Sequence, residues 1–199
     1  MPRNQHPDTR LAILQTALRL IHQKGINDVS LRHIARELSL SPSSLYEYFD
    51  SKDAIMDELR RLGWSLFNSY FEESAAQASP QERLRSLCIA YLRFARENSE
   101  TFNLLFLVSA SKRKRLSESV PADSPYGKLL AVIREGLAAG IFDQRVVGNA
   151  EAGAYSLWAM VHGMATLQNT HLVSFEADWE QAAQDALTIF ITGMMVRFE

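Results

Sequence analysis

Two short amphipathic segments near the N-terminus constrain the fold more than any other feature of the sequence. In the first, Leu31, Ile34 and Leu38 recur at the spacing of one helical face, and the segment lasts about two turns. In the second, Pro42 suits the first turn of a helix that ends near Tyr48. Helices this short are not stable alone, so both must pack against neighbouring helices.

Longer helical segments flank this pair. Apolar residues recur every three or four positions over about 9–24, and Gly25 follows where a left-handed C-cap residue belongs. Another long helix is expected after Asp50, with Ile55 and Leu59 on its inner face. Two short helices about a tight turn, held between two longer ones, form a helix-turn-helix arrangement.

The rest of the sequence predicts further helices and shows no strand-period alternation of useful length. Ser79 and Glu82 have the spacing of a capping box, which marks a helix start. Further helices are expected at about 80–98, 100–110, 129–137, 144–171 and 175–198, with an exposed connection over 111–125 that contains the run Lys112-Arg113-Lys114-Arg115. The expected fold class is all-α, with about nine helices. We expect two domains, a three-helix helix-turn-helix domain over 1–55 and a helical regulatory domain over 56–199.

The composition agrees with this fold class and limits the alternatives. Hydrophobic residues make up 47% of the 199 residues and charged residues 22%, which is normal for a globular protein and too apolar for a disordered one. The net charge is −2, but residues 1–52 carry seven Lys and Arg against five Asp and Glu, so this segment is +2 and the remainder is −4. The asymmetry is compatible with a nucleic-acid-binding N-terminal region on an acidic body.

The cysteine count and the lack of long apolar runs indicate the compartment. With one cysteine, Cys88, no intrachain disulfide can form, and its apolar neighbours favour a buried structural thiol in a reducing environment. No stretch approaches the ~18 uninterrupted apolar residues of a membrane helix. Residues 1–8 are polar and lack the apolar segment of a secretion signal. We therefore expect a cytoplasmic protein with no membrane partner.

The second short helix is the candidate nucleic-acid contact. In a helix-turn-helix this helix enters the major groove of DNA, and its N-terminal residues face the base edges. Small hydroxyl side chains let the backbone approach the duplex, and tyrosine hydroxyls can reach phosphates. Arg32 and Lys52, in the first turns of the helices on either side, suit contacts with the DNA backbone. The candidate DNA-binding residues are Ser30, Arg32, Ser41, Ser43, Ser44, Tyr46, Tyr48 and Lys52.

The same region resembles the DNA-binding domain of the tetracycline-repressor (TetR) family. The resemblance covers about 9–55 and consists of Gly25, VSLRHIAR at 29–36, Leu40-Ser41 and LYEYFDSK at 45–52, in that order and spacing. It implies that all the candidate residues except Ser41 fall where the family contacts DNA, and that double-stranded operator DNA is the partner.

Three residues depart from the family pattern. Ser39 replaces the turn glycine, Ser43 replaces a frequent glycine of the second short helix, and Glu47 places an acid in that helix. If Glu47 faced the duplex it would cost affinity or accept a hydrogen bond from a cytosine amine, whereas if it pointed sideways it would do neither. The departures concern the operator sequence rather than the mode of binding.

A second segment resembles a regulatory domain of the same family. Residues 157–167, LWAMVHGMATL, are similar to the Trp-His-Gly signature of one C-terminal domain type, and the likeness extends over about 80–199. It implies a helical effector pocket and a dimer interface made by the last two helices. The last helix has a broad apolar face that includes small residues. This face suits a dimer interface, and the alternative is that it belongs only to the monomer core. Its residues are Ala182, Ala183, Ala186, Ile189, Phe190, Gly193 and Met194. The candidate effector-binding residues are Tyr91, Phe102, Phe106, Tyr155, Trp158 and His162. The alternative is that these side chains only fill the hydrophobic core.

We therefore expect a ligand-responsive transcription regulator, most simply a homodimeric repressor that a small-molecule effector releases from a palindromic operator, with no cofactor and no metal. The alternatives are an all-helical enzyme and a protein-binding scaffold that has lost DNA binding. The enzyme is disfavoured because the sequence has no HExxH, no paired cysteines for zinc, no glycine-rich phosphate loop and no GxSxG motif. Specific binding to DNA would separate the regulator from the scaffold.

Overall fold

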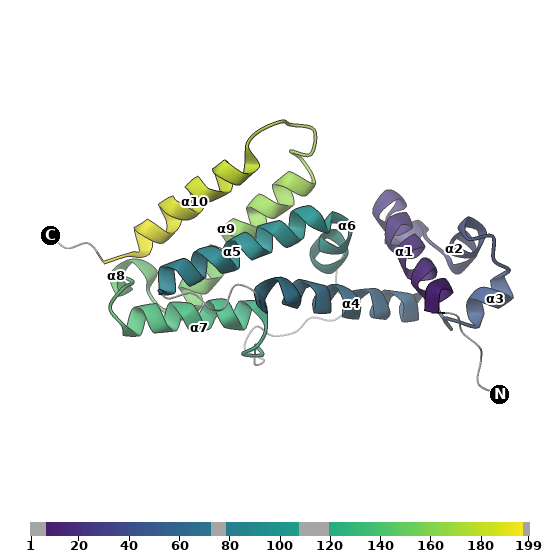
Figure 1. Cartoon of the computed structure of the whole chain (residues 1–199), viewed down its shortest axis with the longest axis horizontal. Helices are drawn as coiled ribbons and strands as arrows, with labels where there is room; N and C mark the ends of the chain where they lie inside the picture. Colours follow the sequence, from purple (N-terminus) through teal and green to yellow (C-terminus); the bar gives the residue numbers. More distant parts are fainter. Residues whose placement is uncertain (1–6, 73–78, 108–119, 197–199) are drawn as a thin grey trace. The chain divides into compact units, whose positions relative to one another are not determined.

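The computed structural model describes residues 7–72, 79–107 and 120–196, and within these ranges the chain forms helices joined by turns, with no strand. The all-α prediction is therefore confirmed. The described residues contain ten α-helices, one 3-10 helix and one π-helix (Figure 1). Their bounds are α1 Pro7–Lys24, the 3-10 helix η1 Ile26–Asp28, α2 Leu31–Glu37, α3 Pro42–Tyr46, α4 Lys52–Glu72, α5 Pro80–Glu97, α6 Ser99–Phe102, the π-helix η2 Asn103–Leu107, α7 Pro125–Ala138, α8 Gln144–Val147, α9 Ala150–Asn169 and α10 Trp179–Met194.

Capping side chains set where several helices begin, as the sequence indicates. Ser30 Oγ accepts a hydrogen bond from the backbone amide three residues on at 3.3 Å, and Ser41 Oγ does the same at 3.0 Å. At α5, Ser79 and Glu82 form the predicted capping box, in which each side chain accepts from the other's backbone amide at 3.3 and 3.2 Å.

The last two predicted helices begin or end at other residues in the structure than the sequence indicates. The segment expected as one helix over 144–171 is divided into α8 and α9, because Gly148 adopts a φ of 76° and Asn149 caps the new helix. The last helix begins at Trp179 rather than near 175, because Asp178 caps it by accepting from the amide of Gln181.

Two other predicted segments also differ. The helix expected over 100–110 begins as α6 and continues as η2, so its backbone changes from α to π geometry. Helix α7 starts earlier than predicted, at Pro125, because Ser124 provides its N-cap. Residues 108–119 lie outside the described residues, and they include the Lys112–Arg115 run.

The described chain divides into two compact units. The head unit consists of 7–66 and 98–107, and the body unit consists of 67–72, 79–97 and 120–196. The head unit therefore contains more than the 1–55 segment, because α6 and η2 pack against α1. This long-range contact joins residues that are about eighty positions apart in the sequence.

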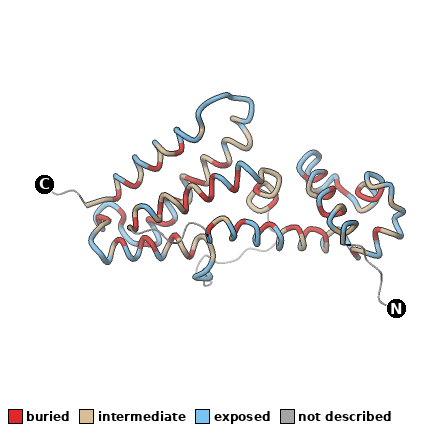
Figure 2. The backbone as a smooth tube through the Cα atoms, in the orientation of Figure 1, coloured by how far each residue is buried: buried red, intermediate tan, exposed pale blue. Residues whose placement is uncertain are grey.

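A shared apolar core fixes the two short helices of the head. Ile34 of α2 and Leu45 of α3 are 1% and 0% exposed, and they pack with Ile13 of α1 and Ile55 of α4. Burying a side chain of this size stabilises the fold by roughly 2 kcal/mol, more than either short helix gains from its own turns. In Figure 2, buried stretches, drawn in red, recur along α1 and α4.

The body unit is a layered helical bundle. Helices α5, α7 and α9 pack against one another, and α10 packs against α5 (Figure 1). Arg85 of α5 donates hydrogen bonds to the side chains of Gln184 and Thr188 of α10, each at 3.1 Å. Phe142 is fully buried beside Gly136, where a Cβ atom would lie 2.1 Å from its ring.

Two further expectations concern the interior and the membrane. Cys88 is buried, as predicted, and burial raises the pKa of its thiol to about 12, so the thiol stays protonated. Among the residues that the structure describes, no helix is both long and apolar enough to cross a bilayer.

Candidate nucleic-acid interface and regulatory site

The turn between α2 and α3 determines how α3 is presented. The amide of Leu40 donates to the carbonyl of Ala35 at 2.8 Å, and the amide of Ser39 donates to that of Arg36 at 3.1 Å. This pair of bonds is a Schellman motif, which requires a left-handed residue at the position of Ser39. Ser39 adopts that conformation, with a φ of 53°, so the chain accepts backbone strain where the family pattern has a glycine.

The start of α3 presents a cluster of hydroxyl groups to solvent. The Oγ atom of Ser41 lies 2.8 Å from that of Ser43 and 2.8 Å from that of Ser44. Tyr46, one turn on, is 48% exposed, while Leu45 points into the core. The structure therefore brings four of the predicted DNA-binding residues together on the outer side of this helix.

Tyr48 differs from Tyr46 in its surroundings. It is half-buried and packs against the apolar core of the head, in the turn that follows α3. At the start of α2, Arg32 is exposed, and the Ser30 hydroxyl accepts the cap bond described above. Because a hydroxyl has one donor as well as two acceptor sites, Ser30 retains the ability to donate to an outside group.

Two cations of the head bind backbone carbonyls at the limits of the helix-turn-helix. Lys52 donates from Nζ to the carbonyl of Ile26, just before α2. Arg10 of α1 donates from Nη1 to the carbonyl of Tyr48, just after α3, at 3.0 Å. Sequence reasoning proposed Arg32 and Lys52 as functional cations and missed Arg10, because a single arginine on an amphipathic helix carries no signal of its partner.

In the body unit, three of the six predicted effector residues form one polar network. The hydroxyl of Tyr91 on α5 lies 2.7 Å from Nδ1 of His162 on α9. Trp158, one turn before His162, donates from its indole N–H to the Tyr91 oxygen. Since an indole is only a donor, the Tyr91 oxygen accepts from Trp158, and the direction of its bond with Nδ1 of His162 follows the tautomer of the imidazole.

Neighbouring rings extend this network. Trp158 and His162 have ring centroids 5.6 Å apart, and Tyr126 of α7 contacts Trp158 edge to face at 5.9 Å. Phe67, at the start of the body part of α4, contacts the Tyr91 ring at 5.4 Å. Tyr126 and Phe67 were not predicted, because nothing in their local sequence indicates which helix they face.

The other three predicted effector residues lie elsewhere. Phe102 is fully buried in the head unit, and Phe106 contacts both Phe102 and Trp64 in that same unit. Tyr155 is 56% exposed on α9. Two of the three therefore belong to the head unit, and the third lies on an exposed part of the body unit.

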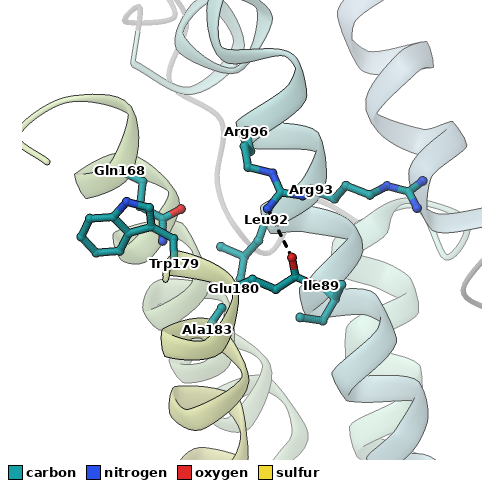
Figure 3. A pocket seen from close by; sticks show the side chains of 8 residues that line it. All are labelled: Ile89, Leu92, Arg93, Arg96, Gln168, Trp179, Glu180 and Ala183. Atoms are coloured by element: carbon teal, nitrogen blue, oxygen red, sulfur yellow. Dashed lines mark ion pairs between the residues drawn. The ribbon is translucent and has the colours of Figure 1, made fainter. Parts of the chain in front are cut away.

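Sequence reasoning also missed a shallow hollow in the body unit, of about 110 Å³, between α5, α9 and α10 (Figure 3). Arg96 and Glu180 pair at its rim at 3.9 Å, and Arg93 stacks on the ring of Tyr70 at 4.9 Å. Its polar groups thus contact one another or point away, and they do not converge on one point. The lining residues are Ile89, Leu92, Arg93, Arg96, Gln168, Trp179, Glu180 and Ala183.

Two sequence families match this chain. The family of bacterial regulatory proteins called tetR matches residues 13–59, which include α2, α3 and the start of α4. The family called tetracyclin repressor-like, C-terminal domain, matches residues 84–190, which is more than half of the chain. The chain belongs to the tetR family.

Relatives and solved structures agree with this membership. The HTH-type transcriptional regulator YobS of Bacillus subtilis is 23% identical over 94% of this chain and 93% of its own length. The HTH-type transcriptional repressor KstR2 of Mycobacterium tuberculosis is 35% identical over 39% of this chain and 40% of its own. Its solved structure matches with a TM-score of 0.75, at 19% identity, over 97% of this chain and 98% of that one. A regulator from Saccharomonospora viridis in complex with choline matches with a TM-score of 0.70, at 24% identity, over 97% of this chain and 100% of that one.

Family membership decides between the functional classes. TetR regulators are ligand-responsive, DNA-binding transcription regulators that work as dimers, so this chain is a transcription regulator and not an enzyme. The predicted resemblance, the helix-turn-helix and the two-part organisation of the fold are thereby confirmed at the level of the family.

The half-buried histidine of the Tyr91 network predicts a pH-dependent stability. Burial lowers the pKa of His162 below its ordinary value of about 6.5, so the unfolded chain takes up a proton before the folded one does. The contribution of neutral His162 is therefore complete above this pH and is lost as the pH falls below it. In His162→Gln, an acceptor for Tyr91 remains but nothing titrates, and the free energy of unfolding by urea should depend less on pH between about 7 and about 5.5.

The matched control is His171→Gln, since His171 is exposed. It removes a histidine outside the Tyr91 network, so a change seen in His162→Gln alone belongs to that network. The carboxylates of Glu135 and Glu151, whose pKa values are lowered by hydrogen bonds from arginines, lose their stabilisation only at more acidic pH. Equal pH dependence in wild type and His162→Gln would contradict the assignment.

Proposed function

We propose that this regulator is a cytoplasmic repressor that holds a palindromic operator as a homodimer and releases it when a small molecule binds in the body unit. One observation carries the proposal. The hydroxyls of Ser41, Ser43 and Ser44 and the side chain of Tyr46 face outward on α3, while Leu45 of the same helix is buried in the core. A two-fold dimer presents two such helices, which suits successive major grooves roughly 34 Å apart.

The proposed DNA contacts have different roles. Ser43 and Ser44 in the first turn of α3, and Tyr46 at its end, face base edges and nearby phosphates. The exposed Arg32 binds a phosphate or a guanine edge. Lys52 has three donors, so it can hold the Ile26 carbonyl and still donate to the flanking phosphate. The remaining proposed contacts, from the cap hydroxyls and the partly buried tyrosine, are Ser30, Ser41 and Tyr48.

A dimer interface formed by α9 and α10 is supported by a second apolar stripe on each helix. On α10, Ala183, Leu187, Ile191 and Met194 are buried in the monomer, whereas Ala182 and Ile189 are exposed, Ile189 by 76%. Gly163 of α9 and Gly193 of α10 have no heavy atom of the described residues within 4 Å of where a Cβ would lie. One glycine inside α9 and one in the last turn of α10, with no close neighbour among the described residues, favour close approach of a second copy.

The effector is proposed to bind beside the network of Tyr91, Trp158 and His162. These residues provide ring faces and one donor–acceptor pair, which suits a small molecule with an apolar body and one hydrogen-bonding group. Relatives of similar fold include a regulator solved with choline and a regulator described as a ketosteroid regulator. Both compounds can stack or pack on aromatic rings, so both are suitable first candidates here.

The DNA contacts predict specific losses of affinity. The operator is a duplex that the wild-type protein selects from a randomised library, and binding is measured by fluorescence anisotropy over a salt series. Arg32→Ala and Tyr46→Ala should each weaken operator binding about tenfold, and Lys52→Ala should weaken it further because it also loses the Ile26 bond. Arg134→Ala, on α7 of the body unit, serves as the cation control. If all three head variants bind like wild type, the proposed contacts are wrong.

The exposed stripe predicts that the dimer is sensitive to charge at one position. Ile189→Glu buries an unpaired carboxylate between the two copies and should yield monomers in sedimentation velocity, with unchanged far-UV circular dichroism. Val146→Glu is the control, because Val146 is 63% exposed on α8 and lies outside the stripe. A dimer that survives Ile189→Glu at micromolar concentration would place the interface elsewhere.

The effector proposal predicts that one hydroxyl group matters for release. A thermal-shift screen of small metabolites, with choline and a ketosteroid included, selects the compound, and its release of the operator is then titrated. Tyr91→Phe removes the hydroxyl that binds His162 and Trp158 and should raise the concentration for half release about fivefold. Tyr155→Phe, at an exposed tyrosine of the same bundle, should not. The opposite ranking of the two variants would reject the proposed location.

A further inference from the structure

The helix-turn-helix is fixed at both limits by hydrogen bonds from cations to backbone carbonyls. Lys52 of α4 binds the Ile26 carbonyl before α2, and Arg10 of α1 binds the Tyr48 carbonyl after α3. The Tyr48 carbonyl lies outside the helices, so no helical hydrogen bond sets its position, whereas Ile26 is the first residue of the single-turn 3-10 helix η1. At both carbonyls the cations add a restraint from the two long flanking helices.

Arg10 makes more contacts than its position on α1 suggests. Its Nη1 donates to the Tyr48 carbonyl at 3.0 Å, and its Nη2 pairs with Glu58 of α4 at 3.3 Å. Its guanidinium also lies over the ring of Phe49, 4.2 Å from the centroid. One side chain therefore joins α1, α4 and the turn that follows α3.

The planar fork of arginine is what allows this arrangement. Two nitrogens of one rigid group reach an oxygen on α4 and a backbone oxygen after α3 while the flat face covers an aromatic ring. A lysine in the same place can donate to both oxygens only from one compact ammonium, and it lacks the flat guanidinium face that covers the ring. Both partners are partly shielded, since the side chains of Arg10 and Glu58 are 34% and 25% exposed.

The restraint acts just beyond the end of a very short helix. Helix α3 has five residues, which is too few for a stable helix, and Leu45 is its one buried residue. The chain then turns through Tyr48 and reaches Phe49, which is 3% exposed. A change at the Tyr48 carbonyl would therefore tilt α3 about Leu45 and displace Ser43 and Tyr46 on its outer face.

We propose that Arg10 is a positioning residue for operator recognition, which holds α3 at the angle that specific binding requires without itself contacting DNA. The inference rests on the DNA-binding role of the head and adds a residue outside the proposed contacts. A positioning role reduces specific binding alone, because contacts with phosphates tolerate small displacements while base contacts do not. A direct phosphate contact would reduce specific and non-specific binding together and would lower the salt slope by about one.

The test compares Arg10→Met, Arg10→Lys and Arg61→Met. Arg61 is the matched control because it pairs with the same Glu58, at 3.3 Å, but only along α4. Affinity is measured by anisotropy for the duplex that wild type selects and for a scrambled duplex of equal length, over a salt series. Amide hydrogen exchange of residues 42–49 reports the mobility of α3 in the free protein.

Arg10→Met should weaken binding to the selected duplex about tenfold, leave the scrambled duplex and the salt slope unchanged, and speed exchange in residues 42–49. Arg10→Lys should recover part of the loss, and Arg61→Met should behave as wild type. Glu58→Gln, which keeps the shape of the partner but not its charge, should show the same pattern more weakly and serves if Arg10→Met does not fold.

Three results would overturn the inference. If Arg10→Met binds the selected duplex like wild type while Arg32→Ala loses affinity, Arg10 has no role in recognition and the proposed DNA contacts are unaffected. Equal losses on both duplexes with a lower salt slope would make Arg10 a phosphate contact. If wild type selects no duplex, the operator proposal fails, and the inference fails with it.

Discussion

The structure of the head depends on the burial of a few apolar side chains from helices too short to exist alone. Ile34 of α2 and Leu45 of α3 pack into a core to which α1 and α4 also contribute residues. Because α3 has five residues, its backbone conformation follows from this packing and not from helix propensity. The outward direction of the Ser41 cluster is a consequence, since the face opposite a buried leucine must meet solvent.

Polar contacts then refine what burial allows. The Schellman bonds through Ser39 set the angle between α2 and α3, at the cost of a left-handed serine. Arg10 and Lys52 fix the two limits of the pair through backbone carbonyls. In the body unit the same logic applies to Tyr91, whose buried hydroxyl is satisfied by His162 and Trp158.

Much of the candidate DNA surface could be predicted from the sequence, because its signals are local. Ser30 and Ser41 cap helices within three residues of themselves, and Pro42 starts α3 in the position that its ring favours. The effector-binding residues were harder to predict, because aromatic residues that line a site and those that fill a core have the same helical spacing in the sequence. Phe102 and Phe106 lie in the head unit, although α5 of the body unit directly precedes them.

The sequence by itself determined the helical class, the capped starts of the helices and the family, since these follow from side-chain spacing and from turn residues that act on their neighbours. Only the tertiary structure decided which side chains meet across helices. Examples are Arg10 with Tyr48, and Tyr91 with His162, whose partners are 38 and 71 positions away. Such pairs depend on how separate helices are rotated and packed, and that depends on the whole core at once.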